Sequence, residues 1–361
     1  MFCVNKVQLA LYSFSKVKYF SNRLSHLNSY AIVFKEYGDP NKVLEKTQCD
    51  VSDDLESSQV LIKILASSIN PADINIIQGK YAIKPKLPAI AGGEAIGEVL
   101  KVGLGVKNLK VGDRVMPAIP ASGTWKTHGV YKDSDLIEID KDIPLQSAVT
   151  LSTNPCTAYR MLKDFVHLKE GDTVIQNGAN SAVGQAAIQI AKHLKINTIN
   201  VVRDRPNLES LKSYLADLGA THVVAENELR SPIMSDIFKQ IPKPSLGFNC
   251  VGGKSAAELI RHMTNKGTLV TYGGMSKLPL TISTACLIFN DIRVVGYWMS
   301  RWVMEHSNEE RSVMLKELTD IVKRGGLKPP THREVDFDNF KDAVAKSMEE
   351  YVTEKQIIVM K

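Results

Sequence analysis

The chain has 361 residues, 44% of them hydrophobic and 23% charged, which is typical of a globular protein with room for two domains. It contains no uninterrupted apolar run of about 18 residues, so no membrane span is expected. The net charge of +6 includes four basic residues in the first 28 positions. The rest of the chain is nearly neutral, which argues against nucleic acid as a partner.

Residues 1–28 are predicted to be a mitochondrial transit peptide. This stretch holds four basic residues, several serines and no acid, and the first acidic residue of the chain is Glu36. A basic, serine-containing composition without acids is typical of organelle targeting segments. We therefore expect a mitochondrial matrix protein, with an unstructured terminus as the alternative.

The five cysteines are scattered and form no CxxC motif or Cys/His cluster with metal-ligand spacing. Neither a disulfide framework nor a zinc site is expected, and the metal prediction is therefore none.

From about residue 30 to 150, short apolar runs such as "QVLIKILASSI" and "GDRVMPAI" alternate with glycine-containing turns, which predicts a mostly β unit. Within it, "INIIQGKY" (74–81) is interpreted as a helix or turn that ends on Tyr81. The tyrosine is either a packing aromatic or an acid.

From residue 173 onward, short apolar strands alternate with segments of helical period. In the segment 207–218, leucines share one face, and Gly219 stands where a helix C-cap needs positive φ. This alternation predicts an α/β fold with a doubly wound parallel sheet of Rossmann type. The predicted strands are 173–178, 198–204, 221–227, 246–252, 267–274 and 292–300, and the predicted helices are 182–194, 207–218, 230–240 and 254–263. A further helix is expected at 310–327, followed by a final edge strand that rejoins the first unit.

A small-residue turn, "NGANSAVG", follows the first of these strands and runs into a helix. Such a turn lets main-chain N–H groups and the positive helix end face a pyrophosphate. The spacing is not a clean GxGxxG, yet its position between strand and helix indicates a dinucleotide site. The candidate contacts are Asn180, Ser181, Ala182 and Val183.

The second strand ends in "NVVRDRPN", with Arg203 at the tip and Arg205 two residues later. An acid at this tip would favour NAD, whereas an arginine fork suits the 2′-phosphate of NADPH. Asp204 is expected to orient one of the arginines. An exposed basic loop without a ligand is the alternative.

The stretch 92–115, "GGEAIGEVLKVGLGVKNLKVGDRV", resembles the medium-chain dehydrogenase/reductase superfamily, and the resemblance covers nearly all of residues 30–361. Zinc members of that superfamily have a metal-binding histidine where this chain has Gly93, so the zinc-free branch is implied. The resemblance implies a GroES-like catalytic domain, built from 29–152 and 306–361, and a Rossmann NADPH-binding domain at 153–305.

Several motifs in order, including "INPADINIIQGKY", "STNPCTAYRML", "NVVRDRP" and "VTYGGMSK", are similar to the mitochondrial trans-2-enoyl-thioester reductases. That family has a glycine where Ala182 stands. The resemblance implies NADPH-dependent reduction of the C2=C3 bond of trans-2-enoyl thioesters of CoA or acyl carrier protein in type II fatty acid synthesis. It implies that Tyr81 is the proton donor and that Asn154 and Lys355 contact the cofactor. It also implies that the protein is a homodimer.

The carboxyl ends of parallel strands face the ligand crevice, so the segments after strands five and six should meet the nicotinamide half of the cofactor. These candidates are Tyr272, Gly273, Gly274, Met275, Tyr297, Trp298, Met299 and Ser300. An acyl pocket could draw on Phe289, Trp298 and Trp302, and a basic rim for a carrier protein could draw on Arg301, Lys316, Lys323 and Arg324. Large aromatics are also common in cores, and lysines at helical spacing usually form a solvated face.

Two alternatives stay open at this point. One is an NADPH-dependent quinone or alkenal reductase on the same scaffold. The other is an NADPH-binding partner protein without turnover.

Overall fold

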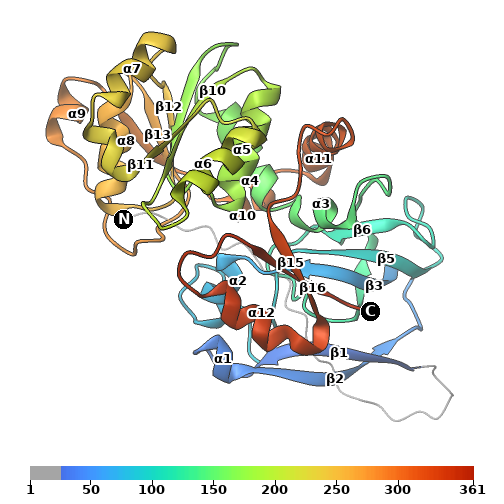
Figure 1. Cartoon of the computed structure of the whole chain (residues 1–361). Coiled ribbons are helices and arrows are strands. Elements are labelled where there is room, and N and C mark those ends of the chain that lie inside the picture. Colours follow the sequence, from blue (N-terminus) through green and yellow to red (C-terminus); the bar gives the residue numbers. More distant parts are fainter. Residues whose placement is uncertain (1–25) are drawn as a thin grey trace, which may run out of the picture.

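The computed structural model describes residues 26–361, coloured along the chain in Figure 1. The predicted transit peptide lies outside the described residues except for positions 26–28. Those three residues begin strand β1 (His26–Phe34), which pairs antiparallel with β2 (Leu44–Ser52) along its whole length.

A six-stranded parallel sheet in the order β11-β10-β9-β12-β13-β14 forms the upper part of the molecule in Figure 1. We call it, with its helices, the parallel-sheet unit. This strand order confirms the predicted doubly wound Rossmann-type sheet. Its strands are β9 (Thr173–Gln176), β10 (Asn197–Val202), β11 (His222–Ala225), β12 (Leu246–Asn249), β13 (Thr268–Thr271) and β14 (Arg293–Gly296). Its crossover helices are α5 (Ala182–His193), α6 (Leu208–Leu218), α7 (Ile233–Gln240) and α8 (Gly253–His262).

Helix α6 shows why the sequence pattern succeeded here. Leu211 and Leu215 are buried, and Gly219 caps the helix with a φ of 110°, the left-handed conformation that glycine adopts without strain. The predicted helix 230–240 is shorter, because residues 226–230 form a 3₁₀ turn and α7 starts only after Pro232. Proline is tolerated at a helix start, because an N–H group at that position would have no partner inside the helix in any case.

The end of the last parallel strand was predicted wrongly. Strand β14 stops at Gly296, and Met299 begins a separate helix, α10 (Met299–Glu305). The short helix α9 (Thr284–Ile288), between β13 and β14, was not predicted. Both helices are about two turns or less, and such short segments carry too little periodicity to be recognised in the sequence.

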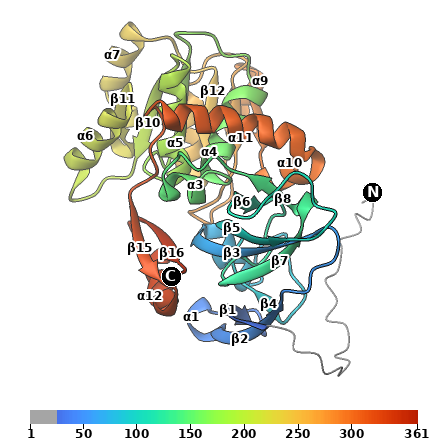
Figure 2. The same cartoon turned by 90° about the vertical axis from the view of Figure 1, so that its right-hand side faces the viewer.

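The second part, which we call the β-rich unit, contains a three-stranded sheet, β2-β1-β4, and a seven-stranded sheet with the path β15-β16-β3-β5-β6-β8, to which β7 is added at β3. Both ends of the described chain contribute to it (Figure 2). The strands not yet given are β3 (Gln59–Ser68), β4 (Ala89–Ile90), β5 (Ala95–Val102), β6 (Arg114–Pro117), β7 (His128–Lys132), β8 (Leu136–Glu138), β15 (His332–Asp336) and β16 (Lys355–Val359). The helices are α1 (Pro40–Val43), α2 (Pro71–Ile77) and α12 (Phe340–Ser347).

The final strand does rejoin the first part of the chain, but its prediction as an edge strand was wrong. Strand β16 pairs parallel with β15 and antiparallel with β3, so it lies inside the sheet, and β15 forms the edge. Its central residues Ile357 and Ile358 are fully buried, as expected for an inner strand.

Helices α3 (Leu145–Thr150), α4 (Asn154–Asp164) and α11 (Asn308–Lys323) lie between the two units (Figure 2). Buried residues of α4 and α11, such as Met161, Met314 and Leu318, share one hydrophobic core with residues of both sheets. The domain boundaries at 152/153 and 305/306 stay a prediction. No helix in the range 26–361 combines the length and apolar character needed to cross a bilayer.

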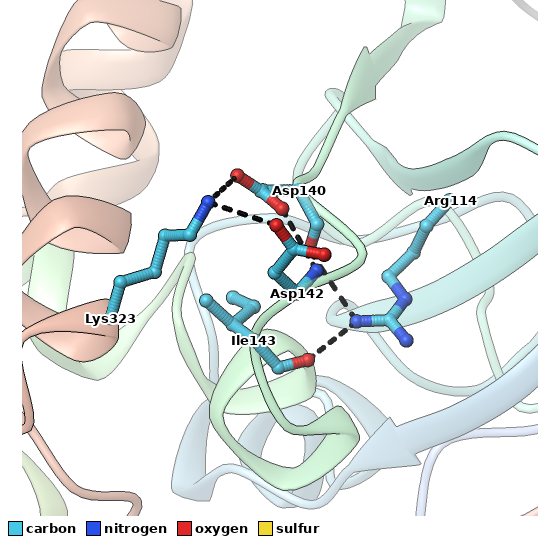
Figure 3. A network of polar contacts seen from close by, with 5 residues as sticks. All are labelled: Arg114, Asp140, Asp142, Ile143 and Lys323. Carbon is cyan, nitrogen blue, oxygen red and sulfur yellow. Dashed lines mark hydrogen bonds and ion pairs between the residues drawn. The ribbon is translucent and has the colours of Figure 1, made fainter.

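A polar network anchors the end of α11 (Figure 3). The ammonium of Lys323 contacts the carboxylates of Asp140 at 2.6 Å and Asp142 at 3.2 Å, and Arg114 donates to the carbonyl oxygen of Ile143 at 2.7 Å. Lys323 is therefore engaged within the chain, which makes it a poor candidate for the basic rim suggested by the sequence.

Candidate functional site

Tyr81 lies just after α2 and meets the parallel-sheet unit. The indole Nε1 of Trp298 donates a hydrogen bond to its hydroxyl oxygen at 2.7 Å, and the two rings meet edge to face with centroids 5.9 Å apart. Trp298 immediately precedes α10, beyond the end of β14. Because the oxygen of Tyr81 accepts this bond, the hydroxyl proton remains available to another acceptor.

The surroundings of Tyr81 keep it protonated. Burial raises its pKa above the ordinary value of 10, whereas hydrogen bonds from Trp298 and Ser300 oppose the shift and the nearby Asp73 carboxylate adds to it. A tyrosine of this kind is neutral at physiological pH and can act as a general acid.

Helix α2, which leads toward Tyr81, begins at a polar N-cap. Asn70 is the N-cap residue, Pro71 follows at the first helical position, and the Asp73 carboxylate accepts the Asn70 backbone N–H at 2.7 Å. Asp73 is buried, and burial raises its pKa far above the ordinary carboxyl range, an effect that Lys355 opposes.

Glu94, at the start of β5, is the acceptor at the centre of a buried polar cluster. Its carboxylate is only 3% exposed and accepts four hydrogen bonds. The donors are Ser68 Oγ, Asn70 Nδ2 at 2.9 Å, Ser152 Oγ at 2.8 Å and the backbone N–H of Thr153 at 2.7 Å. A buried carboxylate is costly unless its oxygens accept hydrogen bonds, and this set of donors supplies them.

Asn154 and Lys355, the two cofactor contacts implied by resemblance, meet in the structure. The Lys355 ammonium donates to the side-chain oxygen of Asn70 and to that of Asn154, the latter at 3.2 Å. Burial lowers the pKa of Lys355, and the carboxylates of Glu94 and Asp73 oppose that shift. Asn154 is the first residue of α4 and not a free turn residue.

The predicted phosphate turn lies at the amino end of helix α5. Ser181 is the N-cap of α5, and its hydroxyl accepts a hydrogen bond from the backbone N–H of Gly184 at 3.1 Å. The side-chain NH₂ of Gln185 donates to the carbonyl oxygen of Asn180 at 2.8 Å. A Cβ on Gly184 would lie 2.5 Å from the carbonyl oxygen of Ala179, so this turn packs closely on its helix. The first turn of α5, including Ala182 and Val183, has main-chain N–H groups without intrahelical partners.

Arg203 and Arg205 follow β10 and share an aromatic support. Their guanidinium groups lie 4.6 and 5.3 Å from the ring centroid of Tyr351, which comes from the C-terminal part of the chain. Arg205 is 8% exposed, and its buried Nε has no hydrogen-bond partner among residues 26–361. Asp204 lies exposed between the two arginines, and the expectation that it orients one of them stays a prediction.

The segments after β13 and β14 divide between surface and interior. The hydroxyl of Tyr272 is buried, and Met275 is 63% exposed. Tyr297 turns into the core, donating to the sulfur of Met299 and packing edge to face on Phe165. Gly273 packs closely, as a Cβ there would be 3.1 Å from the carbonyl oxygen of Cys250, whereas Gly274 has open space around it.

The other aromatic candidates are separated. Trp302 is buried and stacks on His306 with centroids 4.2 Å apart, which is core packing. Phe289, directly after α9, is 77% exposed. Of the three proposed pocket aromatics, only Trp298 contacts Tyr81.

Several site residues were missed from sequence. Glu94 lies in the stretch 92–115, but the sequence assigned it no role. Asn70 and Asp73 are residue types that favour a helix start, which says nothing of a site, and no sequence signal pointed to Tyr351. Their significance depends on contacts between segments 24 to 285 residues apart. In the described part of the chain, no three His, Cys, Asp or Glu side chains gather into a possible metal site.

Two family models match the chain. The alcohol dehydrogenase GroES-like domain matches residues 56–137, in the β-rich unit, and the zinc-binding dehydrogenase model matches residues 182–320. The second description refers to a metal, but Gly93 offers no ligand side chain.

The chain is also similar to individual proteins. It is 49% identical over 330 residues to the mitochondrial enoyl-[acyl-carrier-protein] reductase of Mus musculus, covering 91% of this chain and 88% of that protein. A solved complex of Etr1p with NADP and crotonyl-CoA superimposes with a TM-score of 0.87 at 35% identity, covering 92% of this chain and all of that one. The Etr1p/Etr2p heterodimer, a mitochondrial 2-enoyl thioester reductase from Candida tropicalis, gives 0.86 at 35% identity with the same coverage.

Proposed function

The chain belongs to the family of mitochondrial enoyl-[acyl-carrier-protein] reductases, and on that premise we propose that it reduces the C2=C3 bond of trans-2-enoyl thioesters with NADPH. The observation that carries this proposal is the Tyr81–Trp298 pair. It joins a protonated acid of the β-rich unit to the carboxyl end of the parallel sheet, where ligands of this fold bind.

The residues of the chain fit a phosphorylated dinucleotide. The phosphate turn presents main-chain donors at the start of α5, and the buried Nε of Arg205, next to Arg203, has no partner in the described part of the chain. Two guanidinium groups at this strand tip suit a 2′-phosphate. Asn154 and Lys355 are proposed to contact the cofactor nearer the site of reaction.

Bound NADPH supplies a hydride to C3 of the enoyl thioester. The chain must then deliver a proton to C2, and Tyr81 is the proposed donor because its proton is free while Trp298 holds its oxygen. The product is a saturated acyl thioester, and the tyrosinate recovers its proton from solvent. Trp298 also lowers the cost of the transient negative charge on the Tyr81 oxygen.

The test follows NADPH oxidation by its near-ultraviolet absorbance with crotonyl-CoA, using residues 26–361 and their Tyr81→Phe variant. We expect the variant to lose about a hundredfold in kcat, as for removal of a general acid, while it still binds NADPH. Unchanged kcat would assign the proton to another group. Turnover of quinone alone would favour a quinone reductase, and NADPH binding without any turnover would favour a non-catalytic protein.

We further propose that the protein is a matrix enzyme and a homodimer. The leader composition and the mitochondrial relatives support the location. The edge strand β14 and the exposed Leu287, Ile288 and Phe289 of the adjacent α9 segment support pairing of two parallel sheets at this edge. Fusion of residues 1–28 to a fluorescent protein tests the first proposal, and light scattering of the purified chain tests the second.

A further inference from the structure

We propose that Glu94 is a positioning residue for the proposed reduction: its carboxylate fixes the start of α4, and with it Asn154 and Lys355, against the segment that carries Tyr81. The inference rests on the proposed function, because its readout is the rate of that reaction. It assigns a role to a buried charge that no chemical step uses.

The two carboxylate oxygens of Glu94 bind different parts of the chain. Oε2 accepts from Ser68 and Asn70, at the end of β3 and the start of α2. Oε1 accepts from the hydroxyl of Ser152 and the backbone N–H of Thr153, directly before α4. The carboxylate therefore bridges the β-rich unit and the helix that packs beside α5.

The side-chain amide of Asn70 links Glu94 to Lys355 and Asn154 in one orientation only. Its Nδ2 faces Glu94 at 2.9 Å, and its Oδ1 accepts from Lys355 and from Asn154 at 3.4 Å. Rotating the amide by 180° would put an NH₂ group against the Lys355 ammonium and withdraw the donor from Glu94. The orientation of Asn70 is thus fixed by the charge on either side of it.

Asn70 is also linked, through helix α2, to the proposed proton donor Tyr81. The Asn70 backbone N–H donates to Asp73 in the first turn of α2, and the chain reaches Tyr81 four residues beyond the end of that helix. Tyr81 is held from the other side by Trp298. The Asn154–Lys355 pair is consequently located by one connected set of hydrogen bonds with Glu94 at its centre, and the same set fixes the start of the helix that leads to Tyr81.

The nucleotide itself has other anchors. The phosphate turn and the two arginines belong to the parallel-sheet unit and make no hydrogen bond to Glu94 or Asn70 in the described chain. A disturbance at Glu94 should therefore reduce kcat more than the affinity for NADPH. A purely structural role would instead change the stability of the fold without this separation.

The test uses reversal of hydrogen-bond polarity. Glu94→Gln keeps the size of the side chain but places an NH₂ group against the NH₂ of Asn70, and Asn70→Asp places two carboxylates together. We expect each single variant to lose roughly tenfold or more in kcat with crotonyl-CoA, from one unsatisfied or repelled buried group. The double variant pairs an amide donor with a carboxylate acceptor and keeps the total charge, so kcat should recover to within about threefold of wild type. The dissociation constant for NADPH, measured by fluorescence, should stay within about threefold in all variants.

A matched pair of serines gives a second measurement that does not depend on the folding of Glu94→Gln. Ser152→Ala and Ser68→Ala each remove one hydroxyl donor to the same carboxylate, but only Ser152 belongs to the segment before α4. We expect Ser152→Ala to reduce kcat by about threefold to tenfold and Ser68→Ala to reduce it less.

Three results would overturn the inference: full kcat in Glu94→Gln, no recovery in the double variant, or equal kcat losses in the two serine variants. In each case an active wild type would leave the proposed function intact. An inactive wild type would overturn both.

Discussion

The hydrogen bond from Trp298 to Tyr81 permits a detailed prediction through the variant Trp298→Phe. The substitution removes the indole N–H that lies 2.7 Å from the Tyr81 oxygen and keeps an aromatic ring for the edge-to-face contact. The expected change is therefore mainly electrostatic.

Its magnitude follows from the loss of one partly buried neutral hydrogen bond. Such a bond contributes about 0.5–1.5 kcal/mol, which corresponds to an about 2- to 13-fold decrease in kcat if the whole loss falls on the transition state. The donated N–H stabilises the tyrosinate more than the neutral phenol. Removing it therefore raises the pKa of Tyr81 further above its ordinary value.

The assay is the pH dependence of kcat with crotonyl-CoA and NADPH. A general acid works only while protonated, so activity falls as the pH rises through the pKa of Tyr81. In Trp298→Phe this alkaline limb should move to higher pH while the plateau falls.

Trp302→Phe is the matched control, because Trp302 lies in α10, which Trp298 directly precedes, stacks on His306 and should leave the alkaline limb in place. In a Tyr81→Phe background, Trp298→Phe should cause little further loss, since the bonded oxygen is already absent. Additive losses of the two substitutions, or an alkaline limb that moves to lower pH, would refute this reasoning.

Three further predictions concern the cofactor site and the buried charges. Arg205→Ala should reduce the preference for NADPH over NADH by about 10- to 100-fold, because a charge-assisted contact is lost, and Arg205→Lys should recover it only in part; kcat/KM for the two cofactors measures this. An unchanged preference would place the 2′-phosphate elsewhere. Gly184→Ala should lower the free energy of unfolding by about 1–3 kcal/mol, because the new Cβ would lie 2.5 Å from the Ala179 carbonyl, whereas Gly274→Ala has open space and should change it by less than about 0.5 kcal/mol in denaturant titrations. Burial raises the pKa of Asp73 from 3.8 to about 7. Between about pH 4 and 7 the native state therefore keeps a proton on Asp73 that the unfolded state has lost. The contribution of this group to the free energy of unfolding thus falls as the pH rises through that range. Asp73→Asn should flatten that part of the stability profile, and an identical slope in both proteins would contradict the assignment.

The periodic elements could be predicted from local sequence because their causes are local. The six parallel strands, the helix of Leu211 and Leu215, and its Gly219 cap all follow from side-chain spacing and backbone conformation. The predicted phosphate turn does lie between a strand and a helix for the same reason, since these three segments are contiguous in the chain. The predictions failed where short elements depend on their neighbours, as at the end of β14 and in the inner position of β16.

By itself, the sequence determined the organisation into a β-rich and a parallel-sheet unit. It also predicted a dinucleotide turn, an arginine pair for the cofactor and, through family resemblance, the candidate acid Tyr81. Only the tertiary structure decided which groups act on one another. The bonds from Trp298 to Tyr81 and from Lys355 to Asn70 join residues 217 and 285 positions apart, and the four donors to Glu94 come from two separate segments. Hydrogen bonds of this kind depend on distances of about 3 Å, which sequence spacing cannot specify until the chain has folded.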